Sequence, residues 1–203
     1  MENDRRVRKT KAAIKSAFIQ LLTEKELEKI TIQDITQRAD INRGTFYLHY
    51  EDKYLLLSSM EDEYTFDLTN EVNFEQFINS TMSIDAFAKV FTEQILLRVV
   101  NYLNEHIEFY QAIFNLDRKS QLEEKIANVI LNNMQKYAAP DNTIADVPVD
   151  YFFSYTSGAM IAFIKHWVKD DNRMSPETLV NHLFKIIFNG PLKLMAKEQK
   201  IVE

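Results

Sequence analysis

The chain has 203 residues, a length that fits one domain or two small ones. Apolar residues make up 46% and charged residues 27%, which is typical of a globular rather than a disordered protein. The absence of cysteine excludes disulfides, thiolate zinc sites and cysteine nucleophiles. The net charge is −6, yet residues 1–53 contain eleven Lys and Arg against nine Asp and Glu. Six basic residues and no acidic one lie between Arg5 and Lys15, which indicates either an anionic partner or a solvated terminus.

The charged N-terminus leads into no apolar stretch, so we expect no signal peptide. The longest uncharged segment, residues 151–164, is too short to span a bilayer and predicts a buried helix. We therefore expect a cytoplasmic protein with no membrane partner. Only three glycines and four prolines occur, and helical periodicity runs through most of the chain. This pattern predicts an all-α fold without a glycine-rich phosphate loop.

The first helix is predicted from Ile14, Ala17, Phe18, Leu21 and Leu22, which share one face. Thr10 is expected to be its N-cap, and residues 25–29 a connection. Thr31, with Asp34 three residues on, resembles a capping box and predicts a second helix of about two turns.

Asn42 is placed to cap a third, short helix over residues 43–50, and Asp52 to cap a fourth from Lys53. Two short helices joined by a brief turn predict a helix-turn-helix, whose second helix enters the major groove of DNA. Phe46 and Tyr50 are spaced to face the core, whereas Arg43 and Tyr47 lie together on another face. The small Gly44 lets the helix approach DNA closely.

The segment from Thr31 to Lys53 resembles the DNA-binding signature of the TetR/AcrR family of transcriptional regulators, through its Gly-Thr-Phe-Tyr core and the lysine that opens the next helix. The resemblance extends from about Lys9 to Leu57. It implies a three-helix helix-turn-helix DNA-binding domain over residues 1–53 and a helical effector-binding and dimerisation domain over residues 54–203, with about nine helices in all. Double-stranded DNA is the implied partner.

The resemblance also implies roles for single residues. Tyr47 matches a position that contacts the DNA backbone or a base edge, and Lys53 a phosphate-binding lysine. Thr31 and Thr45 match positions that commonly contact phosphates, whereas Gln33 and Arg43 match positions that tend to read bases. Asp40 stands where the family usually has glycine, although Asp tolerates a left-handed backbone. His49 is expected to be a packed or phosphate-facing ring rather than a catalytic base. The expected DNA-binding set is Thr31, Gln33, Asn42, Arg43, Gly44, Thr45, Tyr47, His49 and Lys53.

Beyond residue 53, Ser83 is placed to cap a long helix, Ser120 begins a second capping box, and residues 138–148 suggest a loop. Two further helices are expected, over about residues 149–169 and 176–188, the latter ended by Asn189-Gly190-Pro191. The resemblance implies a homodimer formed through these two helices. It also implies a small-molecule effector of unknown identity. Candidates for its ligand residues are Phe91, Tyr102, Phe109, Tyr110, Tyr155 and Trp167.

Two functional hypotheses remain at this point. The first is a ligand-responsive, homodimeric repressor that binds a palindromic operator. The second is a protein-interaction co-regulator of the same fold whose DNA binding is weak or lost, suggested by the acidic composition and by Asp40. No nucleophile–base set, metal-ligand spacing or cofactor loop stands out, so we expect no enzyme, no metal and no cofactor.

Overall fold

The computed structural model describes residues 2–71, 82–116, 121–135 and 138–198. Within these residues the secondary structure is helical except for one short hairpin, which confirms the all-α expectation. The chain forms two compact units. Unit 1 comprises Met1–Phe66 and Glu108–Lys125, and unit 2 comprises Asp67–Ile107 and Ile126–Glu203.

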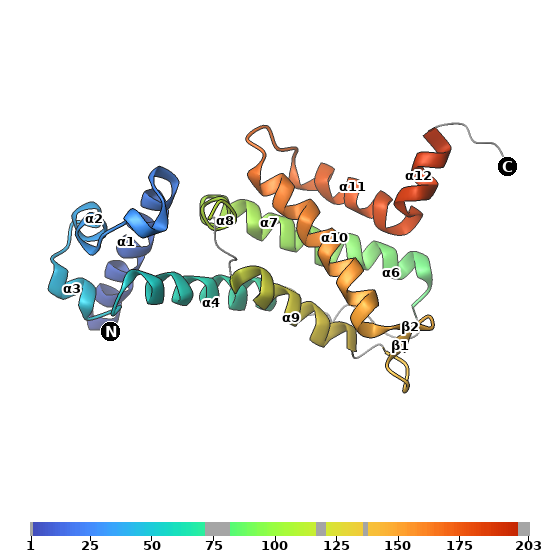
Figure 1. Ribbon diagram of the computed structural model, residues 1–203, viewed down its shortest axis with the longest axis horizontal. Coiled ribbons are helices and arrows are strands. Elements are labelled where there is room, and N and C mark those ends of the chain that lie inside the picture. The colour runs from blue at the N-terminus through green and yellow to red at the C-terminus, as the bar shows by residue number, and fades with distance from the viewer. Residues whose placement is uncertain (1, 72–81, 117–120, 136–137, 199–203) are drawn as a thin grey trace. The chain divides into compact units, whose positions relative to one another are not determined.

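Unit 1 consists of short helices gathered around one end of a longer one. In Figure 1, α1, α2 and α3 lie together at the N-terminal end of α4. The elements that contribute to this unit are α1 (Glu2–Glu24), η1 (Leu27–Lys29), α2 (Ile32–Arg38), α3 (Arg43–Tyr47), α4 (Lys53–Glu71), α8 (Ile107–Phe114) and the start of α9 (Gln121–Gln135).

The core of unit 1 follows the predicted apolar face of α1. All five predicted residues of that face are buried, Ile14 and Phe18 completely, and Phe46 of α3 is also fully buried. Tyr50 is 7% exposed, so the expectation that Phe46 and Tyr50 face the core is confirmed. Burial of these rings fixes which side of α3 remains open to solvent.

The start of α1 was predicted wrongly. The helix begins at Glu2 rather than after Thr10, because residues 2–9 contain no glycine or proline and continue the helix upstream. The Thr10 hydroxyl donates to the Arg6 carbonyl at 3.0 Å, which satisfies it inside the helix. Residues 25–29 are not a plain connection either, since η1 forms there and buries Leu27.

Unit 2 is built from longer helices. A single helical stretch runs through α6 (Ile84–Val90), the π-helical η2 (Phe91–Leu96) and α7 (Leu97–Glu105), and Ser83 caps it as expected by accepting from the Ala86 N–H at 3.2 Å. It packs against α11 (Pro176–Asn189), which follows α10 (Val149–Lys169). The buried side chains of this unit include Ile95, Leu96, Val100, Leu103, Trp167, Val168, Leu179, Val180 and Leu183.

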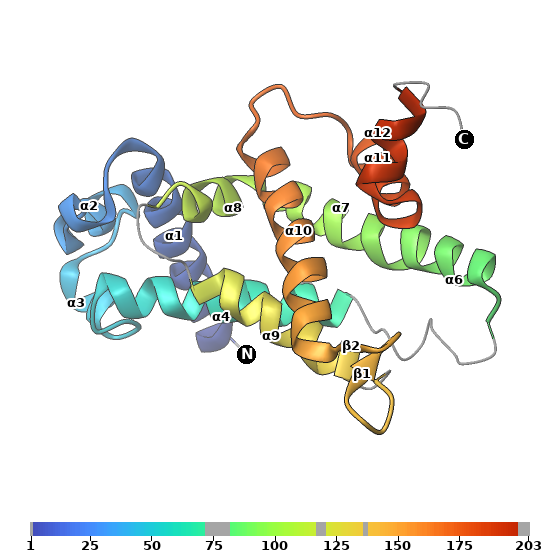
Figure 2. The ribbon, with the colours of Figure 1, turned by 45° about the vertical axis from the view of Figure 1, so that its right-hand side comes forward.

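The expected loop over residues 138–148 is wrong in part, because it contains a hairpin of β1 (Thr143–Ile144) and β2 (Val147–Pro148) directly before α10 (Figure 2). The two turn residues, Ala145 and Asp146, both have positive φ, of 50° and 63°. This conformation is typical of a tight hairpin turn, but such turns usually contain Asn or Gly, so these two residues do not indicate a hairpin.

The end of the chain also differs from expectation. Gly190, with φ of 75°, ends α11 as predicted, but α12 (Pro191–Glu198) begins directly after it. Proline is favoured at the first position of a helix, so the same residue that signals a stop also starts α12. The prediction of a buried helix over residues 151–164 holds for one side of α10 only, because Tyr151 and Tyr155 are 72% and 67% exposed. The predicted capping box at Ser120 lies outside the described residues.

Candidate DNA-binding site

The start of α2 is held by the predicted capping box. The Asp34 N–H donates to Thr31 Oγ1 at 3.1 Å, and the Thr31 N–H donates to Asp34 Oδ2 at 2.7 Å. Two free N–H groups of the first helical turn are therefore satisfied reciprocally. The hydrogen bond from the Thr31 N–H, the ion pair with Lys25 at 2.9 Å and the hydrogen bond from the Thr31 hydroxyl lower the pKa of Asp34 to about 2.

The turn between α2 and α3 takes the shape that the sequence predicted. Asp40 has φ of 52°, in the left-handed region of the backbone. The family usually has glycine at this position. Asn42 then caps α3, its Oδ1 accepting from the Thr45 N–H at 2.7 Å and from the Thr45 hydroxyl at 3.0 Å. Regular α3 ends at Tyr47 rather than at residue 50, because the chain turns through Leu48 and His49 to bury Tyr50.

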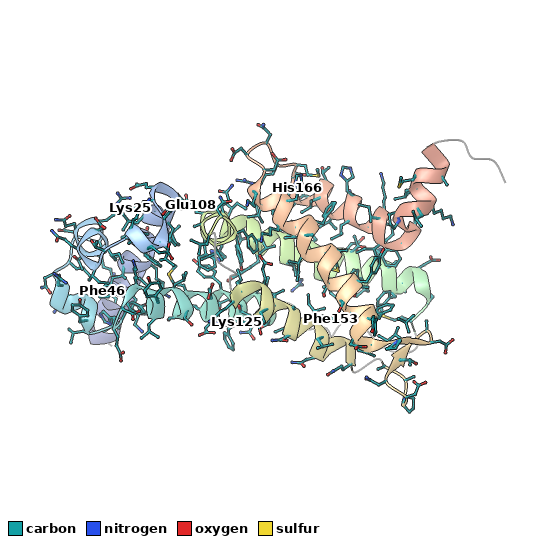
Figure 3. The ribbon with its side chains drawn as sticks, in the orientation of Figure 1. Lys25, Phe46, Glu108, Lys125, Phe153 and His166 are labelled. Atoms are coloured by element: carbon teal, nitrogen blue, oxygen red, sulfur yellow. The ribbon has the colours of Figure 1, made fainter. Side chains whose placement is uncertain are left out.

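The exposed surface of α3 carries the residues expected to read DNA. Arg43 and Tyr47 lie one turn apart, with the Arg43 guanidinium donating to the Tyr47 hydroxyl at 3.5 Å. Tyr47 is 49% exposed, and Gly44 is open to solvent beside it. Phe46, labelled in Figure 3, packs edge-on against the Tyr47 ring from the buried side, with ring centroids 5.7 Å apart. The buried ring therefore supports the exposed one.

The sequence interpretation missed one exposed residue on this helix. Leu48, the C-terminal cap of α3, is 82% exposed. The spacing could have found it, because residue 48 lies four after Gly44 in the same way that Tyr47 lies four after Arg43.

Ion pairs attach α2 to the end of α1. Lys25, which follows α1 in Figure 3, pairs with Asp34 of α2. Arg38 makes two hydrogen bonds to the Glu24 carboxylate, at 2.5 and 2.8 Å. These hydrogen bonds lower the pKa of Glu24 and raise that of Arg38. The helix-turn-helix is thus fixed to α1 by charged groups as well as by apolar packing.

Lys53 has a structural role that the sequence did not indicate. Its ammonium donates to the carbonyl oxygens of Leu27, Glu28 and Ile30 at 2.8, 2.8 and 2.7 Å. An ammonium has three N–H donors, so all of them are used within unit 1. The phosphate contact expected of Lys53 therefore requires at least one of these bonds to break. The N-cap of α4 is Asp52, as predicted, accepting from the N–H groups of Tyr54 and Leu55.

The remaining expected residues lie at several places in unit 1. Gln33 is exposed on α2, while the hydroxyls of Thr31 and Thr45 take part in the two N-caps. His49 is half-buried, with its ring 6.4 Å from that of Tyr50. Arg43, Gly44 and Tyr47 alone are brought together on the open face of α3.

The six candidate ligand residues do not form one cluster. Phe109 and Tyr110 belong to unit 1, where Phe109 stacks on Tyr64 with ring centroids 3.8 Å apart. The other four belong to unit 2. Of these, Tyr155 is exposed, whereas Trp167 is 2% exposed and donates to the Met174 carbonyl at 2.8 Å.

A cavity of unit 1 was not expected from the sequence. It has a volume of about 530 Å³ and lies between α1, α4 and α8. Its walls carry both signs of charge, from Arg8 and Lys11 of α1 and from Glu63 and Glu108, and an ion pair joins Glu63 to Lys15. Among the described residues, no group of three His, Asp or Glu side chains is arranged to bind a metal ion, and no helix is long and apolar enough to cross a membrane.

Comparison with known families assigns this arrangement to a class of regulator. Residues 14–60 match the family described as bacterial regulatory proteins, tetR family, and residues 92–189 match the transcriptional regulator C-terminal region of the same class. The chain belongs to the TetR family of transcriptional regulators. Members of this family are DNA-binding transcription factors and not enzymes, which confirms two of the expectations above.

Two curated relatives are similar over most of the chain. An uncharacterised HTH-type transcriptional regulator of Bacillus subtilis (strain 168), YxbF, is 21% identical over 184 residues. These residues cover 87% of this chain but only 44% of the relative, so the chain spans less than half of its length. The activator of the dhaKLM operon of Lactococcus lactis subsp. lactis (strain IL1403), DhaS, is 26% identical over 171 residues, or 81% of this chain and 82% of the relative.

Solved structures share the fold. A TetR transcriptional regulator from Streptococcus agalactiae 2603V has a TM-score of 0.61 and 24% identity, over 92% of this chain and 98% of that one. NalD of Pseudomonas aeruginosa, the secondary repressor of a multidrug efflux pump, has a TM-score of 0.64 and 19% identity, over 90% and 97% of the two chains. At these identities the likeness establishes the fold alone.

Proposed function

We propose that this protein is a homodimeric, ligand-responsive repressor that binds a palindromic operator through α2 and α3. Its location is then the cytoplasm, where bacteria such as those of the relatives keep their DNA. The observation that supports sequence-specific binding most strongly is the open face of α3, where Arg43 and Tyr47 are exposed above a buried Phe46. An Arg–Tyr pair held in this way adds little to packing but suits the hydrogen-bonding edges of bases.

Contacts to DNA follow from this docking. With α3 in the major groove, Arg43 faces base edges, and Gln33 at the exposed start of α2 lies on the helix that crosses the backbone. The proposed set keeps Thr31, Asn42, Gly44, Thr45, Tyr47 and His49. Lys53, whose three donors bind carbonyl oxygens of residues 27–30, is proposed to position this segment rather than to contact a phosphate. Phosphate contacts orient the protein, whereas the groove-facing side chains of α3 provide specificity.

Dimerisation is proposed through α10 and α11. The solvent-facing side of α10 carries one apolar stripe made of Tyr151, Tyr155, Gly158, Ala159 and Ala162. An added Cβ at Gly158 would meet nothing within 4 Å, so the chain itself does not use this space. A second copy packed on the stripe would bury apolar surface that is now exposed, and a two-fold dimer places two α3 helices in successive major grooves.

The effector is proposed to act by preferring one spacing of the two helix-turn-helix units. Only a ligand that binds the two arrangements with different affinity can shift the dimer away from DNA. The aromatic candidates in both units remain proposals for its site. The Lactococcus relative is described as an activator and the Pseudomonas one as a repressor, so the direction of regulation needs its own measurement.

The first test is binding of the full chain to the DNA upstream of its own gene and to scrambled DNA, at several salt concentrations. We expect specific binding with two subunits per site. Arg43→Ala should weaken specific binding by about 5- to 150-fold while leaving non-specific binding nearly unchanged. Lys29→Ala is the matched control, because Lys29 is an exposed cation of the same unit whose ammonium pairs with Glu26 at 3.0 Å.

Equal losses in the Arg43 and Lys29 variants would mean that only charge matters and would contradict base reading by α3. Weak, equally salt-sensitive binding of the wild type to both DNAs would instead favour the co-regulator hypothesis. The φ of Asp40 argues against that alternative, because the turn keeps its shape without glycine.

The dimer is tested separately by Ala159→Arg. Across a two-fold axis the two arginines would face each other, so we expect about hundredfold weaker dimerisation in analytical ultracentrifugation. Asn128→Arg, at an exposed position of α9, adds the same charge outside the stripe and should remain dimeric. A wild-type monomer, or a dimer that both variants retain, would contradict the interface.

A further inference from the structure

The open face of α3 has two neighbouring rows with different chemistry. Arg43 and Tyr47 form a polar row, joined by their hydrogen bond. Gly44 and Leu48 form the row beside it, one turn apart, with the Leu48 N–H donating to the Gly44 carbonyl at 3.1 Å. This second row offers no polar side-chain atom. Whatever it contacts must therefore be recognised by shape and apolar contact.

Leu48 is an apolar residue that stays exposed although the apolar side chains near it in the sequence are buried. Its neighbours Phe46 and Tyr50 are 0% and 7% exposed, whereas Leu48 is 82% exposed. A lone exposed leucine is common in proteins, so its exposure alone decides nothing. The position of Leu48 does, because a helical side chain leans toward the preceding turn, where Gly44 is exposed beside the Asn42 Oδ1. Together Gly44 and Leu48 form an exposed apolar row beside the hydrogen-bonding row of Arg43 and Tyr47.

The major groove contains one apolar group that an exposed apolar row can contact. Each base pair presents donors and acceptors there, but only thymine adds a methyl group, at C5. We propose that Leu48, over Gly44, contacts the 5-methyl group of a thymine next to the base that Arg43 reads, and thereby determines specificity at that position. This contact depends on the proposed function, in which α3 reads an operator.

The test replaces thymine by uracil, which pairs in the same way but lacks the methyl group. A duplex is first selected from a random library with the full wild-type chain, and its thymines in one half-site are then replaced one at a time. At one of them we expect uracil to weaken wild-type binding about four-fold, the effect of about 0.8 kcal/mol for one buried carbon. Leu48→Ala should bind the thymine duplex more weakly by a similar factor and show no difference between thymine and uracil there.

Leu55→Ala is the matched control, since Leu55 is 48% exposed in the same unit but lies on α4. It should keep the four-fold preference for thymine. Because Leu48 buries so little surface, its variant should unfold at the wild-type temperature, which a thermal scan verifies.

Two results would overturn the contact, and they are distinguishable. If the wild type selects a duplex but Leu48→Ala keeps the full preference for thymine at every position, the thymine contact is wrong while operator binding stands. If the wild type selects no sequence at all, operator reading fails before uracil is introduced, and the thymine contact fails with it.

Discussion

The DNA-reading segment from Thr31 to Lys53 and the C-terminal helices α10 to α12 are stabilised in opposite ways. In the first, polar side chains bind backbone groups two or three residues away, as at Thr31, Asn42 and Asp52. In the C-terminal helices, apolar side chains remain exposed to solvent in the single chain. Among them are Leu192 and Met195 of α12, which are 79% and 59% exposed.

This contrast indicates how the two regions meet their partners. A segment whose caps and turns are satisfied locally keeps one shape, which a rigid groove such as that of DNA requires. Helices with exposed apolar faces gain stability from a further surface, so their arrangement can respond to what binds them. If the two regions are independent, a variant in one should leave the stability of the other unchanged.

The largest effect is expected from Phe46→Ala, which removes a fully buried ring from unit 1. Loss of such a ring lowers the free energy of unfolding by about 3–5 kcal/mol. Trp167 is the single tryptophan and belongs to unit 2, so its fluorescence follows that unit, whereas far-ultraviolet circular dichroism follows both. In urea we expect the dichroism transition to begin earlier while the Trp167 midpoint changes little.

Leu183→Ala is the corresponding change in unit 2, because it truncates a buried side chain there, which is 3% exposed. It should shift the Trp167 midpoint directly, with a loss of about 2–5 kcal/mol. If both variants shift both signals equally, the units unfold as one cooperative body and the contrast drawn above does not extend to their stability.

An intermediate effect is expected from Lys53→Met, which keeps the apolar stem and removes three donors from the carbonyls of Leu27, Glu28 and Ile30. Hydrogen bonds from a charged group contribute about 1.5–3 kcal/mol, and a loss of that size should appear in urea unfolding. Because the ammonium is occupied, the salt dependence of DNA binding should stay unchanged. A slope lower by about one would instead identify a phosphate contact. Lys29→Met, at an exposed lysine of η1, should alter neither quantity.

The DNA-reading segment was largely predictable because its signals are local. Thr31 with Asp34, Asn42 and Asp52 each stand directly before a helix, and each caps it in the structure. The i, i+4 spacing of Phe46 and Tyr50 likewise identified the buried side of α3. Caps and spacing depend on residues within one or two turns, which is the range over which sequence alone is informative.

Features that depend on distant residues were not predictable in the same way. The three carbonyls that bind Lys53 lie 23 to 26 residues before it in the chain. The hairpin turn at Ala145 and Asp146 lacks the glycine or asparagine that marks such turns. Similarly, the exposed stripe of α10 has the same periodicity as a buried one, and only the packing of the chain decides between them.

The smallest effect is expected from Asp34, whose pH dependence tests the local capping of the DNA-reading segment. The pKa of Asp34 is lowered to about 2 in the folded chain, below the ordinary value of 3.8. Its stabilising contribution is therefore complete above about pH 4 and is lost as the pH falls toward 2. Since the carboxylate is partly exposed, we expect a contribution of about 1 kcal/mol, the usual value of a helix cap.

Asp34→Asn should lower the free energy of unfolding at neutral pH and flatten the fall of that free energy between pH 4 and 2, measured by urea unfolding at each pH. An equally steep fall in the variant would assign the acid sensitivity to other carboxylates, and the local capping of α2 would then contribute less to unit 1 than its geometry indicates.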